Sequence, residues 1–445
     1  MLFHSPIYLI IFLPLVVIFY YKINRFLKID NRIVLGFFGL IFYSWWNIYL
    51  TPLIVISILF NYYISNLIIN NQDQVKKKRL LIFSIILNVI YLGIFKYTDF
   101  IIQNINLLLS TNFNYLNLPF PLAISFFTFQ SIAFLVNVYD KDIINVKIKD
   151  FFLFIIFFPQ LIAGPIVKYN FMMPQFNSGD NTFFNKRNFI IGLIILSIGL
   201  IKKVYFADTL SQFVDIGHEN VNELNLLSSW LISLCFTFQF YFDFSGYVDM
   251  ATGSAMMINI VLPQNFNSPL KATSVIDFWQ RWHITLSNFL TNFIYYPLLR
   301  SLKKISFFNS IIITVCVFLI AGIWHGPSWN FILFGLFHGL GLSVNHIYKK
   351  YFNFDISKYF FWFLTFNFVN ISFILFRTDK IENIIFILKK MFDIKYFFYD
   401  SLLIDRISLE FLNDLNLIIC FFLSIIVCIF FKNSYVLLKK NDKKI

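Results

Sequence analysis

Long apolar stretches alternate with short polar connections along almost the whole chain, a pattern typical of helices that cross a lipid bilayer. The apolar stretches cover residues 7–21, 33–50, 52–70, 80–96, 119–138, 150–166, 188–206, 228–262, 281–298, 308–346, 359–376 and 413–431. At roughly 20 residues per crossing, they predict about eleven transmembrane helices. The connections are too short to fold alone and no internal repeat is visible. We therefore predict an all-α, polytopic integral membrane protein with a single membrane-embedded domain over residues 1–445.

One stretch does not fit a simple crossing. Residues 230–262 are too many for one span and too few for two, and Gly246 and Gly253 interrupt them. Irregular backbone at membrane depth is tolerated only where it is buried in protein or lines a cavity. We therefore expect a broken or re-entrant helix here.

Lysine and arginine gather in the polar connections and predict how the chain is oriented. They are Lys22, Arg25, Lys28 and Arg32 after the first stretch, a cluster at 76–79 two stretches later, and Lys439, Lys440, Lys443 and Lys444 in the tail. Because basic connections stay on the cytoplasmic side, Met1 is expected outside and Ile445 inside, which requires an odd number of crossings. The first stretch lacks a preceding positive charge and a cleavage site, so it is predicted to be a retained span and not a signal peptide.

Composition supports lipid as the solvent and excludes other classes of protein. Apolar residues make up 58% of the chain, aromatic residues 21% and charged residues only 13%. The net charge of +13 comes from connections that form no basic groove or stripe, so nucleic acid is not an expected partner. The four cysteines fall inside apolar stretches, and neither they nor the histidines have the spacing of a metal site, so no metal is expected.

Two histidines at the edges of apolar stretches are the main candidates for chemistry. His283 follows Trp282, and His325 lies between Trp324 and Gly326. An ionisable group beside lipid is costly and is a functional candidate by default, although a histidine can also bond a backbone carbonyl and merely join two helices. A histidine can take the proton from a hydroxyl that attacks a thioester and then return it to the leaving thiol. Exclusion of water would protect the acyl donor from hydrolysis.

Other polar residues are candidates for supporting roles. His338 lies 13 positions after His325, which on one continuous helix places it at roughly 220°, on a largely opposite face, and we expect it to be structural. Asp243 and Asp249 lie inside an apolar stretch and need compensating partners. They could orient a catalytic imidazole or belong to a structural polar network that joins helices. The supporting candidates are Asp243, Asp249, Arg281, Trp324, Lys202 and Lys203.

Several short motifs follow one another in a characteristic order. They occupy residues 158–166, 199–204, 241–250, 263–267, 277–287, 322–326 and 376–377. Over about residues 80–390, the chain resembles the membrane-bound O-acyltransferase (MBOAT) family. The resemblance is to its bacterial polysaccharide branch, which includes the alginate O-acetylation protein and the D-alanyl-lipoteichoic acid transferase.

The resemblance implies a fold, an activity and partners. The fold would be a ring of helices around a central catalytic passage in the bacterial cytoplasmic (inner) membrane. His325 takes the place of the family's essential histidine, and His283 that of its second one. An acetyl group would pass outward from acetyl-CoA, with no bound cofactor, toward a hydroxyl of an envelope polysaccharide or peptidoglycan. Besides membrane lipid, the expected partner is an SGNH-type acetyltransferase or esterase outside the membrane.

The chain departs from the family pattern at one place, and two other activities stay open. Thr291 and Asn292 stand where the family usually shows an Arg-Asp pair, which is expected to bear on acceptor or partner choice. One alternative is transfer of D-alanine from a carrier protein to teichoic acid. A transporter or flippase for a glycan or lipid intermediate is another, but it would call for inverted repeats and paired broken helices.

Overall fold

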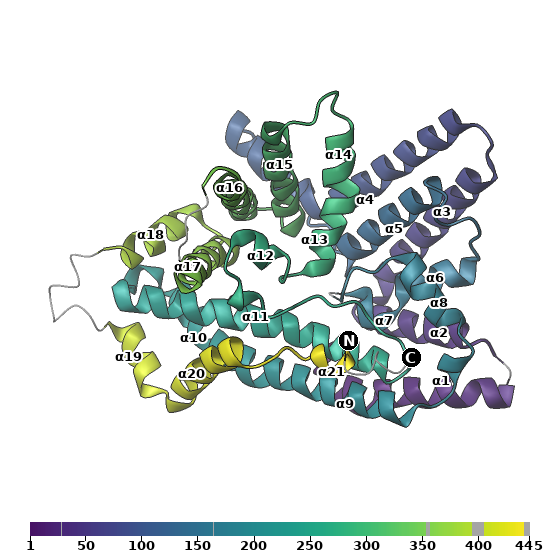
Figure 1. Ribbon diagram of the computed structural model, residues 1–445, viewed down its shortest axis with the longest axis horizontal. Helices are drawn as coiled ribbons and strands as arrows, with labels where there is room; N and C mark the ends of the chain where they lie inside the picture. Colours follow the sequence, from purple (N-terminus) through teal and green to yellow (C-terminus); the bar gives the residue numbers. More distant parts are fainter. Residues whose placement is uncertain (28, 163, 353–356, 394–404, 440–445) are drawn as a thin grey trace. The chain divides into compact units, whose positions relative to one another are not determined.

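The structure is a computed structural model that describes residues 1–445 except 28, 163, 353–356, 394–404 and 440–445. All secondary-structure elements of the described residues are helical (Figure 1). The chain forms two compact units: unit 1 is Met1–Ser197 with Tyr247–Pro263, and unit 2 is Ile198–Gly246 with Gln264–Ile445. Lys28, Ala163 of the 158–166 motif, and Lys440, Lys443 and Lys444 of the basic tail lie outside the described residues.

Six helices of the described chain are long and apolar enough to cross a membrane. They are Ile48–Asn70, Gln74–Leu109, Lys186–Glu219, Phe307–His325, Trp329–Tyr351 and Lys358–Arg377. Arg406–Asn413 and Leu415–Phe430 would add a seventh span if this pair, bent by 83°, counts as one. The all-helical, multi-pass architecture is therefore confirmed, whereas the predicted number of about eleven crossings is not.

Unit 1 contains the first helices of the chain. They are α1 (Leu13–Leu27), α2 (Asn31–Ser44), α3 (Thr51–Asn70), α4 (Gln74–Leu109), α5 (Ile124–Tyr139), α6 (Ile148–Ile156), α7 (Phe158–Leu161), α8 (Tyr169–Asn177) and most of α9 (Lys186–Leu200). Helices α3, α4 and α5 lie side by side (Figure 1). Asn61 and Asn88 exchange side-chain hydrogen bonds of 3.2 and 2.8 Å between α3 and α4. Such paired amides join helices where lipid offers no other partner.

Unit 2 contains most of the later helices. They are α10 (Asp208–Glu219), most of α11 (Leu226–Met256), α12 (Val275–Trp279), α13 (Ile284–Leu290), α14 (Tyr296–Arg300), α15 (Phe307–His325), α16 (Trp329–Tyr351), α17 (Lys358–Arg377), α18 (Ile381–Met391), α19 (Arg406–Asn413), α20 (Leu415–Phe430) and α21 (Val436–Lys439). Helices α15 and α16 form a hairpin (Figure 1). A Cβ atom on Gly335 would lie 2.3 Å from the carbonyl oxygen of Phe318 and 3.0 Å from the Cα of Gly322. The two backbones can approach this closely only because both positions are glycine.

The prediction of a broken or re-entrant helix over residues 230–262 is wrong. Helix α11 runs without interruption from Leu226 to Met256. Within unit 2, a Cβ on Gly246 would lie 2.9 Å from the carbonyl oxygen of Gly199; within unit 1, a Cβ on Gly253 would lie 2.5 Å from that of Gly192. The two glycines therefore allow close packing against neighbouring backbone and do not break the helix.

Two predicted stretches are divided in the structure. Residues 281–298 do not form one span, because α13 begins only after His283 and continues through a π-helical segment, Thr291–Tyr295, into α14. The segment in which the chain departs from the family pattern is thus this π-helical one. Residues 308–346 form α15 and α16, which are separated after His325 by Gly326, Pro327 and Ser328. Both candidate histidines therefore lie at helix ends.

Candidate functional site

His283 is held in an unusual backbone conformation by one neighbouring segment. It is buried, immediately precedes α13 and has a φ of 43°, in the left-handed region that costs a non-glycine residue about 1–2 kcal/mol. The backbone N–H of Ile284 donates to the carbonyl oxygen of Asn265 at 3.0 Å. The backbone N–H of Asn267 donates to that of Arg281 at 2.9 Å. These two bonds hold the strained residue in place.

The side chain of Asn265 fixes the proton of His283. The Asn265 Oδ1 atom accepts from the backbone N–H of Thr285 at 3.2 Å and from its hydroxyl at 2.9 Å, which identifies it as the amide oxygen. His283 Nδ1 lies 3.1 Å from the same oxygen and must therefore donate a hydrogen. In the neutral ring, the lone pair is then on Nε2, the atom that can act as a base.

Burial keeps this imidazole neutral. His283 lies between α12 and α13, outside the candidate spans. Burial, followed by the positive charge of His325, lowers the pKa of His283 to about 3. The ring is therefore neutral throughout the physiological pH range.

His325 ends α15 and is surrounded by aromatic rings. The ring centroids of Trp324, Phe376, Phe334 and Phe331 lie 4.9, 5.3, 5.8 and 6.5 Å from that of His325. Trp324, one of the supporting candidates, is buried. The Trp324 ring therefore forms one wall beside the His325 imidazole.

Aromatic rings of α11 and α17 link the two histidines. The Phe244 ring lies 4.9 Å from that of His283. One turn earlier, the Phe240 ring lies 4.8 Å from Phe376, which in turn contacts His325. The charge of His325 also acts on the pKa of His283. Two segments that are distant in sequence thus bring their imidazoles to the same aromatic cluster within unit 2.

The expectation that His338 lies on a face opposite His325 is wrong. The two residues do not share a helix, because α15 ends at His325 and α16 begins at Trp329. The Phe334 ring contacts both imidazoles, with centroids 4.6 Å from His338 and 5.8 Å from His325. The indole N–H of Trp279 donates to His338 Nδ1 at 3.1 Å, so in the neutral ring Nε2 carries the hydrogen. Sequence reasoning missed this neighbour because it assumed one continuous helix.

Lys203, one of the supporting candidates, lies beside Asp243. Its Nζ lies 2.7 Å from Asp243 and 2.9 Å from Asp208. Arg281, another supporting candidate, pairs with Asp277 at 2.7 Å. Asp277 lies four positions before Arg281, a spacing at which side chains meet on successive turns.

The other two supporting candidates of α11 and its neighbour are Asp249 and Lys202. Lys202 Nζ lies 6.0 Å from the centre of the Tyr241 ring, in a cation–π arrangement. Asp249 is buried and lies six residues beyond Asp243, in the part of α11 that belongs to unit 1.

Apolar spans, an all-helical fold, a buried histidine and a second, half-buried histidine are the features of a membrane-embedded enzyme. The family model of MBOAT, the membrane-bound O-acyltransferase family, matches residues 38–381. The chain belongs to this family and is an O-acyltransferase.

Three relatives differ in how much of the chain they match. A peptidoglycan O-acetyltransferase of Helicobacter pylori is 41% identical over 94% of this chain and 84% of its own length. A probable alginate O-acetylase of Pseudomonas syringae is 31% identical over 95% and 80%. A teichoic acid D-alanyltransferase of Bacillus subtilis is 24% identical, over 53% of this chain and 61% of its own length.

Proposed function

We propose that the protein is an O-acetyltransferase that moves an acetyl group from a cytoplasmic thioester donor across the membrane toward a hydroxyl of an envelope glycan. The carrying observation is the convergence of His283 and His325 on one aromatic cluster, with His283 held neutral and its Nε2 lone pair available. Acetyl-CoA is the proposed donor. The proposed location of the protein is the cytoplasmic membrane, with Met1 outside and Ile445 in the cytoplasm.

The proposed chemistry needs one base that becomes an acid. A histidine Nε2 takes the hydroxyl proton while the hydroxyl oxygen forms a bond to the carbonyl carbon of the thioester. The carbon–sulfur bond then breaks and the same proton passes to the leaving sulfur, so that an ester and a thiol result. The aromatic walls exclude water, which protects the thioester from hydrolysis.

The relatives support acetyl as the acyl group and peptidoglycan as the first acceptor to test. The two relatives that match most of this chain are named for O-acetylation, one of peptidoglycan and one of alginate. The relative named for D-alanyl transfer matches about half of the chain, at 53%. If the transfer is completed outside the membrane, an SGNH-type protein is the proposed partner.

The test is chemical analysis of ester-linked groups on the envelope glycans of cells with the intact gene, without it, and with His325→Ala or His283→Ala. We expect ester-linked acetate to disappear without the gene and to fall at least 100-fold in both variants, because loss of general acid–base catalysis typically costs 10²–10⁴-fold. His346→Ala, on the same α16 hairpin but outside the aromatic cluster, is the matched control and should keep the wild-type level.

Immunoblots of membrane fractions would establish that every variant is present in equal amount. Unchanged acetate in the gene deletion would refute the proposed activity. Loss of ester-linked D-alanine instead of acetate would show that the transferred group is D-alanyl and not acetyl. Wild-type acetate in His325→Ala would refute the role of that histidine.

A further inference from the structure

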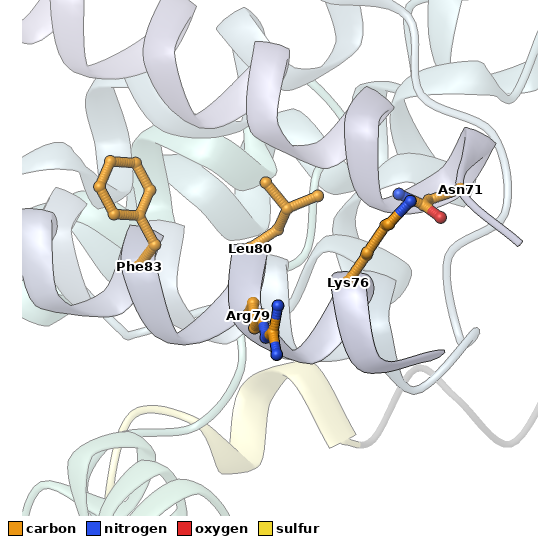
Figure 2. Close-up of a pocket in the computed structure, with 5 residues that line it drawn as sticks. All are labelled: Asn71, Lys76, Arg79, Leu80 and Phe83. Atoms are coloured by element: carbon orange, nitrogen blue, oxygen red, sulfur yellow. The ribbon is translucent and has the colours of Figure 1, made fainter. Parts of the chain in front are cut away.

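The beginning of α4 carries a cavity that is unrelated to the histidine cluster. The cavity measures about 360 Å³ and is lined by Asn71, Lys76, Arg79, Leu80 and Phe83, all in unit 1. The last four follow one another at i, i+3, i+4 and i+7, so they share one face of the helix. Figure 2 shows the Lys76 side chain extending toward Asn71, with Leu80 and Phe83 further along the same helix. One helix face therefore changes from basic to apolar along its length.

The two cations of this cavity have no acidic partner within ion-pair distance in the described part of the chain. Lys76 and Arg79 are both exposed. The neighbouring acid, Asp73, accepts instead from the backbone N–H groups of Val75 and Lys76, at 2.8 and 3.4 Å, and caps the helix. No acidic side chain of the described residues therefore neutralises the positive charge at the cavity.

A second cavity in unit 1 differs because its cations are paired with carboxylates. It measures about 410 Å³ and is also lined by two cations, Arg32 and Lys149. Both of them pair with Asp30, at 2.6 and 2.7 Å, and Arg32 also pairs with Asp150 at 2.9 Å. The Arg32 guanidinium holds the pKa of Asp30 well below its usual value. The cations of this second cavity are paired with carboxylates, whereas Lys76 and Arg79 have no such pair among the described residues.

The position of the α4 cavity points to the membrane as the source of that anion. Lys76 and Arg79 occupy the first turns of the candidate span Gln74–Leu109, immediately before its apolar part. Only 17% of the apolar window of this span is buried, against 28–39% for the other five unbroken spans. Phe83 is 51% exposed. The cavity thus opens on a helix surface that faces lipid, at the depth where phospholipid headgroups lie.

We propose that this cavity binds the headgroup of an anionic phospholipid. The phosphate would lie between Lys76 and Arg79, and an acyl chain would follow Leu80 and Phe83 along α4. Asn71 is oriented for a third contact, because its Oδ1 accepts from the backbone N–H of Asp73 at 2.9 Å and its amide nitrogen is left to donate. This binding site is independent of the proposed acetyl transfer.

The test uses the full-length protein, purified and reconstituted in nanodiscs that contain phosphatidylglycerol, phosphatidylcholine or mixtures of the two. Native mass spectrometry after release counts the phosphatidylglycerol molecules that remain bound. We expect selective retention of phosphatidylglycerol by the wild type. In the double variant Lys76→Gln/Arg79→Gln, the apparent affinity should fall about 30-fold, because each basic residue near a membrane surface contributes about fivefold.

Charge-matched controls separate this site from a general loss of positive charge. Lys78→Gln/Lys147→Gln removes two exposed cations of unit 1 that do not line the cavity and should keep the wild-type affinity. The exchange Lys76→Arg/Arg79→Lys should also keep it. The proposal is overturned if the first double variant retains phosphatidylglycerol like the wild type, or if the wild type retains phosphatidylcholine equally. It is also overturned if free coenzyme A displaces the lipid, since the site would then belong to a soluble phosphate.

Discussion

Asn265 positions both the ring and the backbone of His283, a role that its place in the sequence does not indicate. Its side-chain oxygen is shared by His283 and Thr285, and its carbonyl oxygen holds the backbone after the histidine. The motif that contains Asn265 is visible in the sequence, but its role is not, because 18 residues separate it from His283. The two histidines themselves could be predicted, since an ionisable group in an apolar context stands out by its cost.

Replacing Asn265 should therefore change how His283 works. Asn265→Leu removes the acceptor that selects the tautomer, and we expect acetyl transfer to slow about 10–100-fold, the typical loss when an orienting partner is removed. Asn265→Asp keeps an acceptor and adds a negative charge, which raises the pKa of His283 from its low native value. Transfer rates measured against pH should then show the acidic limb at higher pH than in the wild type.

The comparison of Asn265→Asp with Asn265→Leu distinguishes a positioning role from a structural one. A residue that merely fills space would be replaced equally well by leucine, and the pH profile would not move. Wild-type transfer by Asn265→Leu at every pH would contradict the assigned role.

At the scale of helices, glycine occurs both inside a continuous helix and just after the end of one. Gly246 and Gly253 were expected to break α11, but they pack against neighbouring backbone inside a continuous helix. The true interruption between α15 and α16 falls after His325, at Gly326, Pro327 and Ser328. Apolar composition predicts that a segment is helical, but whether a glycine ends a helix or allows it to pack depends on the neighbour, which a single sequence does not contain.

The α15–α16 hairpin should be sensitive to one methyl group. Gly335→Ala places a Cβ 2.3 Å from the carbonyl oxygen of Phe318, so one backbone must move away from the other. We expect a loss of about 1–3 kcal/mol in stability, the usual cost of overpacking, together with slower acetyl transfer because His325 ends α15. Thermal unfolding in detergent measures the first effect.

Gly93→Ala is the matched control for this prediction. Gly93 lies within α4 and a Cβ there would meet no atom within 4 Å. The same substitution should be neutral or slightly stabilising at this position, because alanine favours helix more than glycine. Equal effects of the two substitutions would mean that backbone contact in the hairpin is unimportant.

For the molecule as a whole, the sequence predicted the class better than the details. The family resemblance over about residues 80–390 is confirmed by a family match over 38–381. The number of crossings, the orientation of the termini and a single domain stay predictions, because length and composition identify six or seven spans and the chain forms two compact units. Alternating basic connections constrain orientation only when every crossing between them is known.

The central claim is that His283 and His325 act as one catalytic unit, and a double-mutant cycle tests it most directly. The rate of acetyl transfer is measured for the wild type, His283→Ala, His325→Ala and the variant with both substitutions. Groups that act together lose most of their effect with the first substitution, so the account predicts that the double variant is no slower than the slower single variant, within about threefold. Losses that multiply, or a wild-type rate in either single variant, would contradict it.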